Sequence, residues 1–189
     1  MKLPGRVAVL LALACAAPRA FASGVDVRLR QEASRTYEIE GAFTVKAPSS
    51  VVWDVLTDYE RIPDFVKSMR ASRVLDGRRD GPALVEQEAV GGIFFVSRSV
   101  RVLLQVTRAP GRLDFRDVDG GDFRTYSGSW RTSPVPNGTR VSYRLVAAPR
   151  FFAPSFLLKP GMRDAARGLL SQVRAEIVRR AGEPAFASR

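Results

Sequence analysis

The sequence predicts one α+β domain in which a curved antiparallel sheet wraps around a long C-terminal helix. Residues 160–180 place apolar side chains at three- and four-residue steps, which is typical of an amphipathic helix. Between residues 36 and 148 most of the chain instead alternates apolar and polar side chains, with short turn-forming pairs between the segments. A chain of 189 residues, 46% of them hydrophobic, is long enough for one domain with a core. We expect the functional site in the space between sheet and helix.

The C-terminal helix is predicted to begin at Pro160, because proline suits the first helical position. Its apolar stripe, which needs a partner surface, consists of Met162, Ala165, Ala166, Leu169, Leu170, Val173 and Ile177. Charged residues, Glu176 among them, occupy the other faces. We expect residues 169–177 to close the core and a cavity to open beside residues 156–162.

The first 22 residues have the pattern of a secretory signal peptide. A basic start precedes an apolar run over residues 7–17, and small residues in an A-x-A pattern end at Ala22. The run is too short to span a membrane, which takes ~20 apolar residues. We therefore predict cleavage after Ala22 and a mature chain that begins at Ser23 in the periplasm. An alternative interpretation is a lipoprotein that is acylated at Cys15.

The chain is strongly basic, with a net charge of +11 at neutral pH. Loss of the predicted signal peptide removes three basic residues and no acids, so the mature chain stays basic. Excess arginine could attract anionic lipid, cell-wall polymers or nucleic acid, or it could simply occupy solvated positions along the strands. The predicted export argues against nucleic acid as the partner.

The composition excludes several classes of catalytic site. The sequence has no histidine, and its one cysteine lies in the predicted signal peptide. Ser-His-Asp catalysis, histidine metal sites and thiolate chemistry are therefore excluded from the mature chain. We expect no metal and no cofactor.

The remaining elements follow in chain order. Residues 23–35 alternate apolar with charged side chains and form an N-terminal extended segment or an edge strand. The domain proper, residues 36–181, opens with a strand in which Gly41 indicates a bulge or a close approach. Two short helices within residues 48–69 and a series of strands lead to the final helix, giving a sheet of about six to seven strands. Residues 182–189 are predicted to be a disordered tail.

Three stretches carry a more specific pattern: APSSVVWDVLTDYERIPDFVKSMRASRVL, GSW and PNGTRVSYRL. Their most specific residues are Asp58, Tyr59, Ile62, Pro63, Phe65, Gly128 and Trp130. From about Tyr37 to Arg180 the chain resembles the START-like (SRPBCC) superfamily, in particular its polyketide cyclase/dehydrase and coenzyme Q-binding protein branch. The resemblance implies a helix-grip fold with a hydrophobic cavity, ligands such as lipids, quinones or polyketides, and matched residues that mark the fold. The signal peptide departs from the better-known members, so their ligands and partners transfer poorly.

Charged residues on the predicted strands are the candidates for chemistry. Arg98 stands on an otherwise apolar strand face that continues with Val100 and Leu104. On the cavity side its guanidinium would meet a carboxylate, phosphate or carbonyl group of a ligand; alternatively, a bulge turns it to solvent. Glu86 and Glu88 share one strand face, which suits acid–base chemistry only if both are buried. A solvated strand face is the simpler interpretation for both glutamates.

The expected ligand cavity combines apolar side chains with aromatic residues that carry a polar tip. Its predicted lining is Tyr37, Arg98, Val100, Leu104, Phe115, Tyr126, Trp130, Tyr143, Phe156, Leu158 and Met162. An ordinary place in the core is the alternative for each aromatic residue. Tyr143 is the strongest candidate, because its strand should face the long helix.

The segment of residues 150–159 is unusually aromatic for a connection. Phe151, Phe152 and Phe156 are flanked by basic residues at both ends. Three roles are open: a flexible cap over the cavity mouth, a turn packed on the sheet edge, or a transient contact with a membrane surface.

These observations predict an exported, non-catalytic binding or carrier protein for a hydrophobic small molecule such as a lipid, a quinone or a polyketide-like compound. A cyclase- or hydrolase-like enzyme that uses a cavity arginine, glutamate or tyrosine is the second hypothesis. A basic interaction module is the third.

Overall fold

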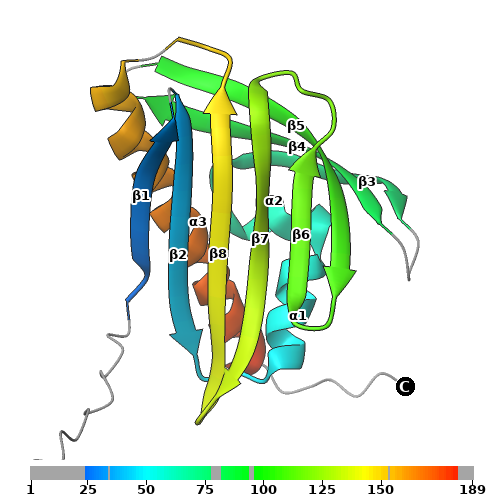
Figure 1. The fold of residues 1–189 in the computed structure, drawn as a ribbon. Coiled ribbons are helices and arrows are strands. Elements are labelled where there is room, and N and C mark those ends of the chain that lie inside the picture. Colours follow the sequence, from blue (N-terminus) through cyan, green and yellow to red (C-terminus); the bar gives the residue numbers. More distant parts are fainter. Residues whose placement is uncertain (1–23, 34, 78–81, 94–95, 153, 183–189) are drawn as a thin grey trace, which may run out of the picture.

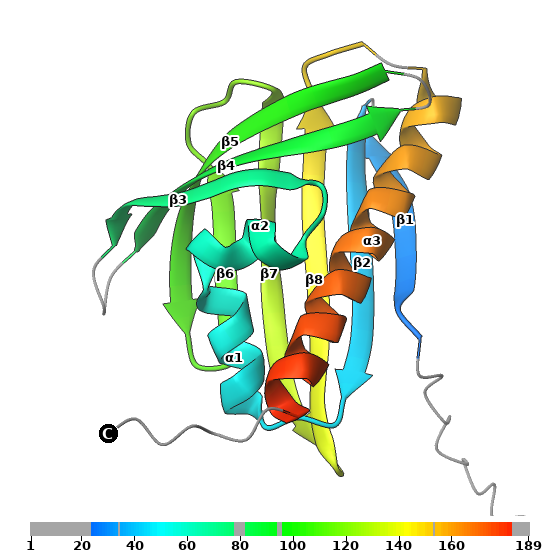
Figure 2. The same ribbon diagram turned by 180° about the vertical axis from the view of Figure 1, so that it is seen from behind.

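The computed structural model describes residues 24–182 except 34, 78–81, 94–95 and 153; the side chains of residues 33 and 91–98 are not described either. The predicted signal peptide, Cys15 and the predicted tail beyond residue 182 therefore lie outside the described residues. Within the described part, an antiparallel sheet curves around one long helix and a group of short helical turns (Figures 1 and 2).

The sheet has eight strands in the order β1-β2-β8-β7-β6-β5-β4-β3. The strands are β1 (Asp26–Ala33), β2 (Thr36–Val45), β3 (Met69–Gly77), β4 (Ala83–Ile93), β5 (Val96–Ala109), β6 (Arg112–Asp117), β7 (Phe123–Val135) and β8 (Gly138–Pro149). Every neighbouring pair is antiparallel. The predicted α+β helix-grip fold is confirmed. The sheet has eight strands rather than six to seven because the N-terminal segment pairs with β2 as an edge strand.

The strands divide the sheet into two faces. On β8, Tyr143 and Leu145 are buried, whereas Arg144 between them is exposed. We call the face with Tyr143 and Leu145 the inner face and the face with Arg144 the outer face. Figure 2 shows the helices lying against the inner face, with β3, β4 and β5 curling over them. The core therefore lies between the inner face and the helices.

The long helix, α3 (Ser155–Gly182), begins earlier than the sequence predicts. Pro160 lies inside the helix and not at its first position, so the prediction of the start is wrong. Proline has no amide hydrogen to donate to the carbonyl of Phe156, which weakens the helix there. Leu158 in this extra segment is only 2% exposed, and its burial offsets part of that cost.

Helix α3 packs directly on the inner face at Gly41. A Cβ atom at Gly41 would overlap Cδ1 of Leu170, a side chain that is fully buried. The pairing of β2 with β1 and β8 continues through Gly41 without a shift in register. Of the two predicted reasons for this glycine, the close approach is confirmed and the bulge is not.

Glu176, which the sequence places outside the apolar stripe of α3, is nevertheless buried. Glu176 is 7% exposed. Its carboxylate accepts hydrogen bonds from Nε (2.8 Å) and Nη2 (2.7 Å) of Arg179 and from Nε of Arg180 (2.7 Å). These hydrogen bonds, those from Arg179 foremost, hold the pKa of Glu176 at about 2. The helix can bury this acid because its own arginines lie one turn away.

Three short segments fill the rest of the inner side: α1 (Ser49–Thr57), the 3-10 turn η1 (Tyr59–Arg61) and α2 (Ile62–Phe65). The predicted pair of short helices is thus present, although the second ends earlier than residue 69. Asp58, between α1 and η1, accepts a hydrogen bond from Nη2 of Arg180 at 2.8 Å. This contact ties the short segments to the end of α3, so Asp58 has a structural role.

Candidate ligand cavity

A cavity of about 110 Å³ lies between the inner face and the helices. Its lining is mostly aliphatic and aromatic: Val55, Leu56, Tyr59, Ile62, Phe65, Val66, Met69, Val85, Gln87, Leu104, Val106, Leu113, Phe115, Tyr126, Trp130, Tyr143, Leu169 and Val173. The sheet contributes residues from β3 to β8, and the rest come from α1, η1, α2, α3 and Val66, which directly follows α2. A binding cavity with this composition takes apolar ligands and orients them through few polar groups.

Aromatic side chains form the sheet side of the cavity. The ring of Tyr143 is 4.5 Å from the ring of Trp130 and 6.3 Å from that of Phe115, centroid to centroid. These separations are typical of favourable aromatic pairs. Gly128 makes room for the cluster, because a Cβ atom there would come within 2.6 Å of Cζ of Phe115 and would also overlap the carbonyl oxygen of Arg144. This explains why the GSW stretch needs a glycine.

Two of the cavity tyrosines form a pair. The hydroxyl groups of Tyr126 and Tyr143 are hydrogen-bonded to each other. Burial raises the pKa of Tyr126 to about 12 and raises the pKa of Tyr143 well above its ordinary value. Both hydroxyls therefore stay protonated at neutral pH. Because each already has the other as a hydrogen-bond partner, neither requires a ligand atom to satisfy it.

Tyr59 differs from this pair. Its side chain is only 7% exposed, and within the described part of the chain its hydroxyl makes no hydrogen bond of good geometry, although the Arg108 guanidinium is close enough to act on it by charge and by a weak hydrogen bond. Burial raises its pKa, and the guanidinium of Arg108, with Cζ 5.6 Å from the ring centroid, partly opposes that effect. A buried hydroxyl that lacks a good hydrogen bond costs free energy. A ligand atom that forms this bond with Tyr59 would recover that cost.

Five residues of the predicted lining border the cavity: Leu104, Phe115, Tyr126, Trp130 and Tyr143. The cavity is not lined by five others: Tyr37, Val100, Phe156, Leu158 and Met162. Tyr37 and Leu158 are buried in the core, Val100 and Met162 pack against it, and Phe156 is 74% exposed. The cavity lies beside Leu169 and Val173, not at the N-terminal end of α3 where we expected it to open. Ligand binding by the five residues remains a prediction.

None of the charged candidate residues is placed in the cavity. Arg98 pairs with Gly91 in the β4–β5 register, but its side chain is outside the described part, so its orientation stays a prediction. Glu86 and Glu88 alternate with Val85 and Gln87, which line the cavity, so the glutamates belong to the outer face. Glu88 accepts a hydrogen bond of 2.5 Å from the Ser99 hydroxyl. Neither glutamate is available to a ligand in the cavity.

Sequence reasoning missed the contribution of the short helical segments. Tyr59, Ile62 and Phe65 recur every third residue, which places them on one side of consecutive helical turns. The resemblance had singled them out, but only as markers of the fold. Their regular spacing was the signal that they form one wall of the cavity.

The aromatic segment of residues 150–159 has both packed and exposed members. The ring of Phe151 lies edge-on to that of Phe123, with centroids 6.4 Å apart. Phe152 and Phe156 are 83% and 74% exposed. No described residue of this segment lines the cavity.

The described residues contain neither a membrane-spanning helix nor a cluster of metal ligands. No helix among them is long and apolar enough to cross a membrane. They also include no group of three or more potential metal-ligating side chains.

A curved antiparallel sheet that closes with a C-terminal helix over an apolar cavity defines a helix-grip binding fold. The chain belongs to the family described as polyketide cyclase / dehydrase and lipid transport, which it matches over residues 45–174. This confirms the resemblance to the START-like superfamily. No curated protein sequence matches the chain.

Solved structures share the fold at low sequence identity. A protein of Thermus thermophilus superimposes with a TM-score of 0.67 at 20% identity, over 77% of this chain and 99% of its own. A STAR-related lipid transfer protein fragment from Xanthomonas axonopodis superimposes with a TM-score of 0.65 at 22% identity, over 82% of this chain and 94% of its own. The Zhui aromatase/cyclase from Streptomyces sp. R1128 superimposes with a TM-score of 0.65 at 17% identity, over 82% of this chain and 99% of its own.

Proposed function

We propose that this protein binds a hydrophobic small molecule in the cavity between the inner face and α3. The observation that carries the proposal is the buried Tyr59 hydroxyl, which borders an apolar cavity and makes no hydrogen bond of good geometry within the described chain. A ligand with one hydrogen-bonding group would satisfy it. The family description and the name of the Xanthomonas lipid transfer protein support a lipophilic ligand.

The cavity size narrows the ligand class. A volume of about 110 Å³ is close to the ~150 Å³ of an engineered apolar cavity that binds benzene. One ring therefore fits the cavity as it stands. A quinone or polyketide-like compound could place a ring there, whereas a longer chain would require the wall to open.

The proposed role is binding or carriage and not catalysis. The polar groups of the described lining are tyrosine hydroxyls, the Gln87 amide and the Trp130 indole. Burial raises the pKa of all three tyrosines, so they act as neutral hydrogen-bonding groups at neutral pH. Such a set orients a ligand but supplies no group that is poised to exchange protons near pH 7.

We place this carrier in the periplasm on the basis of the N-terminal sequence. Processing after Ala22 would leave a chain that begins at Ser23. Sequencing the N-terminus of the protein from its native host tests this. A chain that begins with acylated Cys15, or one that retains Met1, would contradict it.

The exposed aromatic segment supports a transient membrane contact for loading or release. The N-terminal end of α3 lies at one end of the molecule (Figure 1). Phe156 belongs to the first turn of α3, Phe152 comes shortly before the helix, and Cζ of Arg35 is 5.4 Å from the ring centroid of Phe152. Exposed aromatic rings beside cations suit a membrane surface. Replacing both phenylalanines with serine should reduce cosedimentation with phosphatidylglycerol vesicles, and unchanged cosedimentation would contradict the contact.

Two nearly isosteric probes, toluene and p-cresol, test the cavity proposal by calorimetric titration. We expect p-cresol to bind at least about fivefold more tightly, because its hydroxyl can pair with Tyr59 at a net gain of ~1 kcal/mol. Tyr59→Phe should remove that preference and leave toluene binding intact. A preference for p-cresol that survives in Tyr59→Phe would contradict the role of Tyr59, and failure of both probes to bind would contradict the proposed function.

A cavity-filling variant provides the matched control. Leu169→Trp on α3 should fill the cavity and abolish the binding of both probes. Val178→Trp places the same side chain at a position of α3 that is 50% exposed, and it should leave binding unchanged. Equal loss in both variants would indicate damage to the helix and not a filled cavity.

A further inference from the structure

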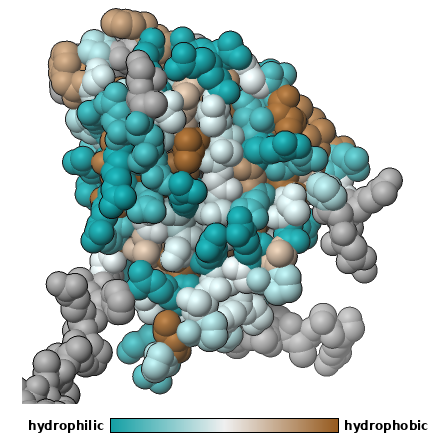
Figure 3. All heavy atoms as spheres, viewed as in Figure 1, coloured by the Kyte–Doolittle hydropathy of each residue, from teal (hydrophilic) through white to brown (hydrophobic). Residues whose placement is uncertain are grey.

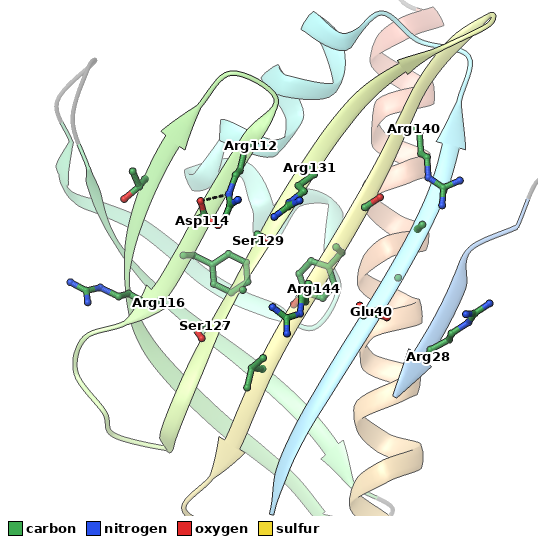
Figure 4. A pocket seen from close by; sticks show the side chains of 18 of the residues that line it. Arg28, Glu40, Arg112, Asp114, Arg116, Ser127, Ser129, Arg131, Arg140 and Arg144 are labelled. Atoms are coloured by element: carbon green, nitrogen blue, oxygen red, sulfur yellow. Dashed lines mark hydrogen bonds and ion pairs between the residues drawn. The ribbon is translucent and has the colours of Figure 1, made fainter. Parts of the chain in front are cut away.

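The outer face of the sheet carries a second hollow that the apolar cavity does not explain. The hollow has a volume of about 800 Å³ and is open to solvent. The face that Figure 3 shows is mostly hydrophilic, and Figure 4 shows arginines of β6, β7 and β8 around small side chains of the same strands. Serines on the floor and arginines on the rim create the hollow, because the arginine side chains extend far beyond the serines.

The strand register puts four arginines around one point. Arg131 on β7 lies directly opposite Arg112 on β6 and opposite Ser142 on β8. Arg140 and Arg144 are the residues two positions to either side of Ser142, so both are diagonal neighbours of Arg131. We call Arg112, Arg131, Arg140, Arg144, Ser129 and Ser142 the arginine pocket. Like charges opposite each other destabilise a sheet, so this arrangement is costly without an anion.

The charges of the arginine pocket are only partly neutralised. Arg112 donates two hydrogen bonds to Asp114, of 2.6 and 2.8 Å, and Arg144 is paired with the buried Glu38. Arg131, at the centre, makes no hydrogen bond or ion pair through its side chain with any described residue. Its planar guanidinium is therefore available for a bidentate contact with an oxyanion.

The surroundings favour a compact anion over a long polymer or a membrane. Glu40 on β2 lies opposite Arg144, and Asp114 on β6 lies opposite Ser129. These acids stand on both sides of the arginine pocket, as Figure 4 shows, and would repel a polyanion that continued across the sheet. Adjacent strands are ~4.8 Å apart, so neighbouring arginines can reach different phosphate groups of one small molecule.

We propose that the arginine pocket binds a small, soluble anion with two or more linked phosphate groups. Arg131 contacts one phosphate bidentately, Arg112, Arg140 and Arg144 surround it, and the hydroxyls of Ser129 and Ser142 donate hydrogen bonds from the floor. Phe115 and Tyr143 border both the outer hollow and the apolar cavity, but none of the six residues of the arginine pocket lines the apolar cavity, because they lie on the outer face of the sheet. Anion binding in the arginine pocket is therefore independent of the proposed carrier function.

Calorimetric titration of the mature protein with tripolyphosphate at low salt tests the proposal. Arg131→Gln should weaken tripolyphosphate binding at least tenfold. The affinity of Arg131→Lys should lie between those of the parent and Arg131→Gln, because lysine keeps the charge but not the bidentate geometry. Arg163→Gln, on α3 away from the sheet, is the control and should leave binding unchanged. Arg131→Gln should unfold at the same or a slightly higher denaturant concentration, because it relieves the repulsion with Arg112.

Three outcomes would overturn the proposal. One is the absence of tripolyphosphate binding in the parent protein. Another is equal weakening by Arg131→Gln and Arg163→Gln, which would indicate diffuse attraction to a basic surface. The third is a protein that binds phosphatidylglycerol vesicles or a single-stranded oligonucleotide through Arg131 but not tripolyphosphate, which would assign the outer face to a membrane or a nucleic acid.

Discussion

The two faces of β7 and β8 are made from alternate residues of the same strands, yet they differ in every chemical respect. Trp130 of β7 lines the inner cavity and a Cβ atom at Gly128 would point at the Phe115 ring, whereas Ser129 between them borders the outer hollow. The inner face is filled by large apolar side chains, so the space that remains is small. On the outer face small residues stand among long arginines, so the hollow is wide and polar. A single two-residue period thus creates two candidate sites of opposite character.

The largest expected contrast between the faces is at adjacent residues of β7. Gly128→Ala places a methyl group against the Arg144 carbonyl and the Phe115 ring, and backbone cannot yield easily there. We expect a loss of about 3 kcal/mol or more in the free energy of unfolding. Ser129→Ala on the outer face should change it by no more than about 0.5 kcal/mol. Urea denaturation of both variants measures the difference, and similar losses would break the comparison.

A second contrast concerns acidic pH. The folded-state pKa of Glu176 is about 2, below its ordinary value near 4.5, so its ionised form stabilises the fold above pH ~4.5 and this contribution disappears as the pH falls towards 2. The shift corresponds to about 3 kcal/mol. Glu176→Gln should therefore be less stable than the parent at pH 7 and nearly equal to it at pH 2.

Urea denaturation at pH 7, 4 and 2.5 measures this effect of Glu176. Glu60→Gln, an exposed position on η1, serves as the matched control. A difference between parent and Glu176→Gln that stays constant over this pH range would show that the carboxylate is not held by Arg179 and Arg180.

The smallest predicted effect separates the tyrosines of the inner face. Tyr59→Phe should leave stability unchanged or raise it by up to about 1 kcal/mol, because it removes a buried hydroxyl that makes no hydrogen bond of good geometry. Tyr143→Phe should lower stability by about 1 kcal/mol, because it breaks the hydrogen bond with Tyr126. Thermal unfolding measures both changes, and a loss in Tyr59→Phe would mean that its hydroxyl is already satisfied.

The sequence predicted what depends on local periodicity. The alternation in β8 placed Tyr143 on the inner face, and the interruption at Gly41 indicated a bulge or a close approach, of which the close approach is confirmed. It failed where distant segments decide the outcome. The start of α3 depends on the burial of Leu158, and the burial of Glu176 depends on Arg180, which also binds Asp58. For Tyr59, the three-residue spacing with Ile62 and Phe65 indicated a shared side, but only tertiary packing shows that this side faces the cavity.

The arginine pocket could not be predicted from the sequence, because it also depends on contacts between separate segments of the chain. Its arginines come from three strands, and nothing in the sequence shows that Arg131 would pair with Arg112. Evenly scattered arginines favoured an ordinary solvated surface. Only the register of β6, β7 and β8 brings four of them together.

The most direct test of the central claim, that the inner cavity takes the ligand, uses the two tryptophans of the protein. Trp130 lines the cavity and Trp53 does not, so their indole Nε1–H signals in an ¹⁵N-labelled protein report on separate places. Trp53→Phe assigns the two signals. On titration with p-cresol, the Trp130 signal should shift in a saturable manner while the Trp53 signal stays in place. A saturable shift of Trp53 alone, or binding that moves neither signal, would contradict a ligand site in the cavity.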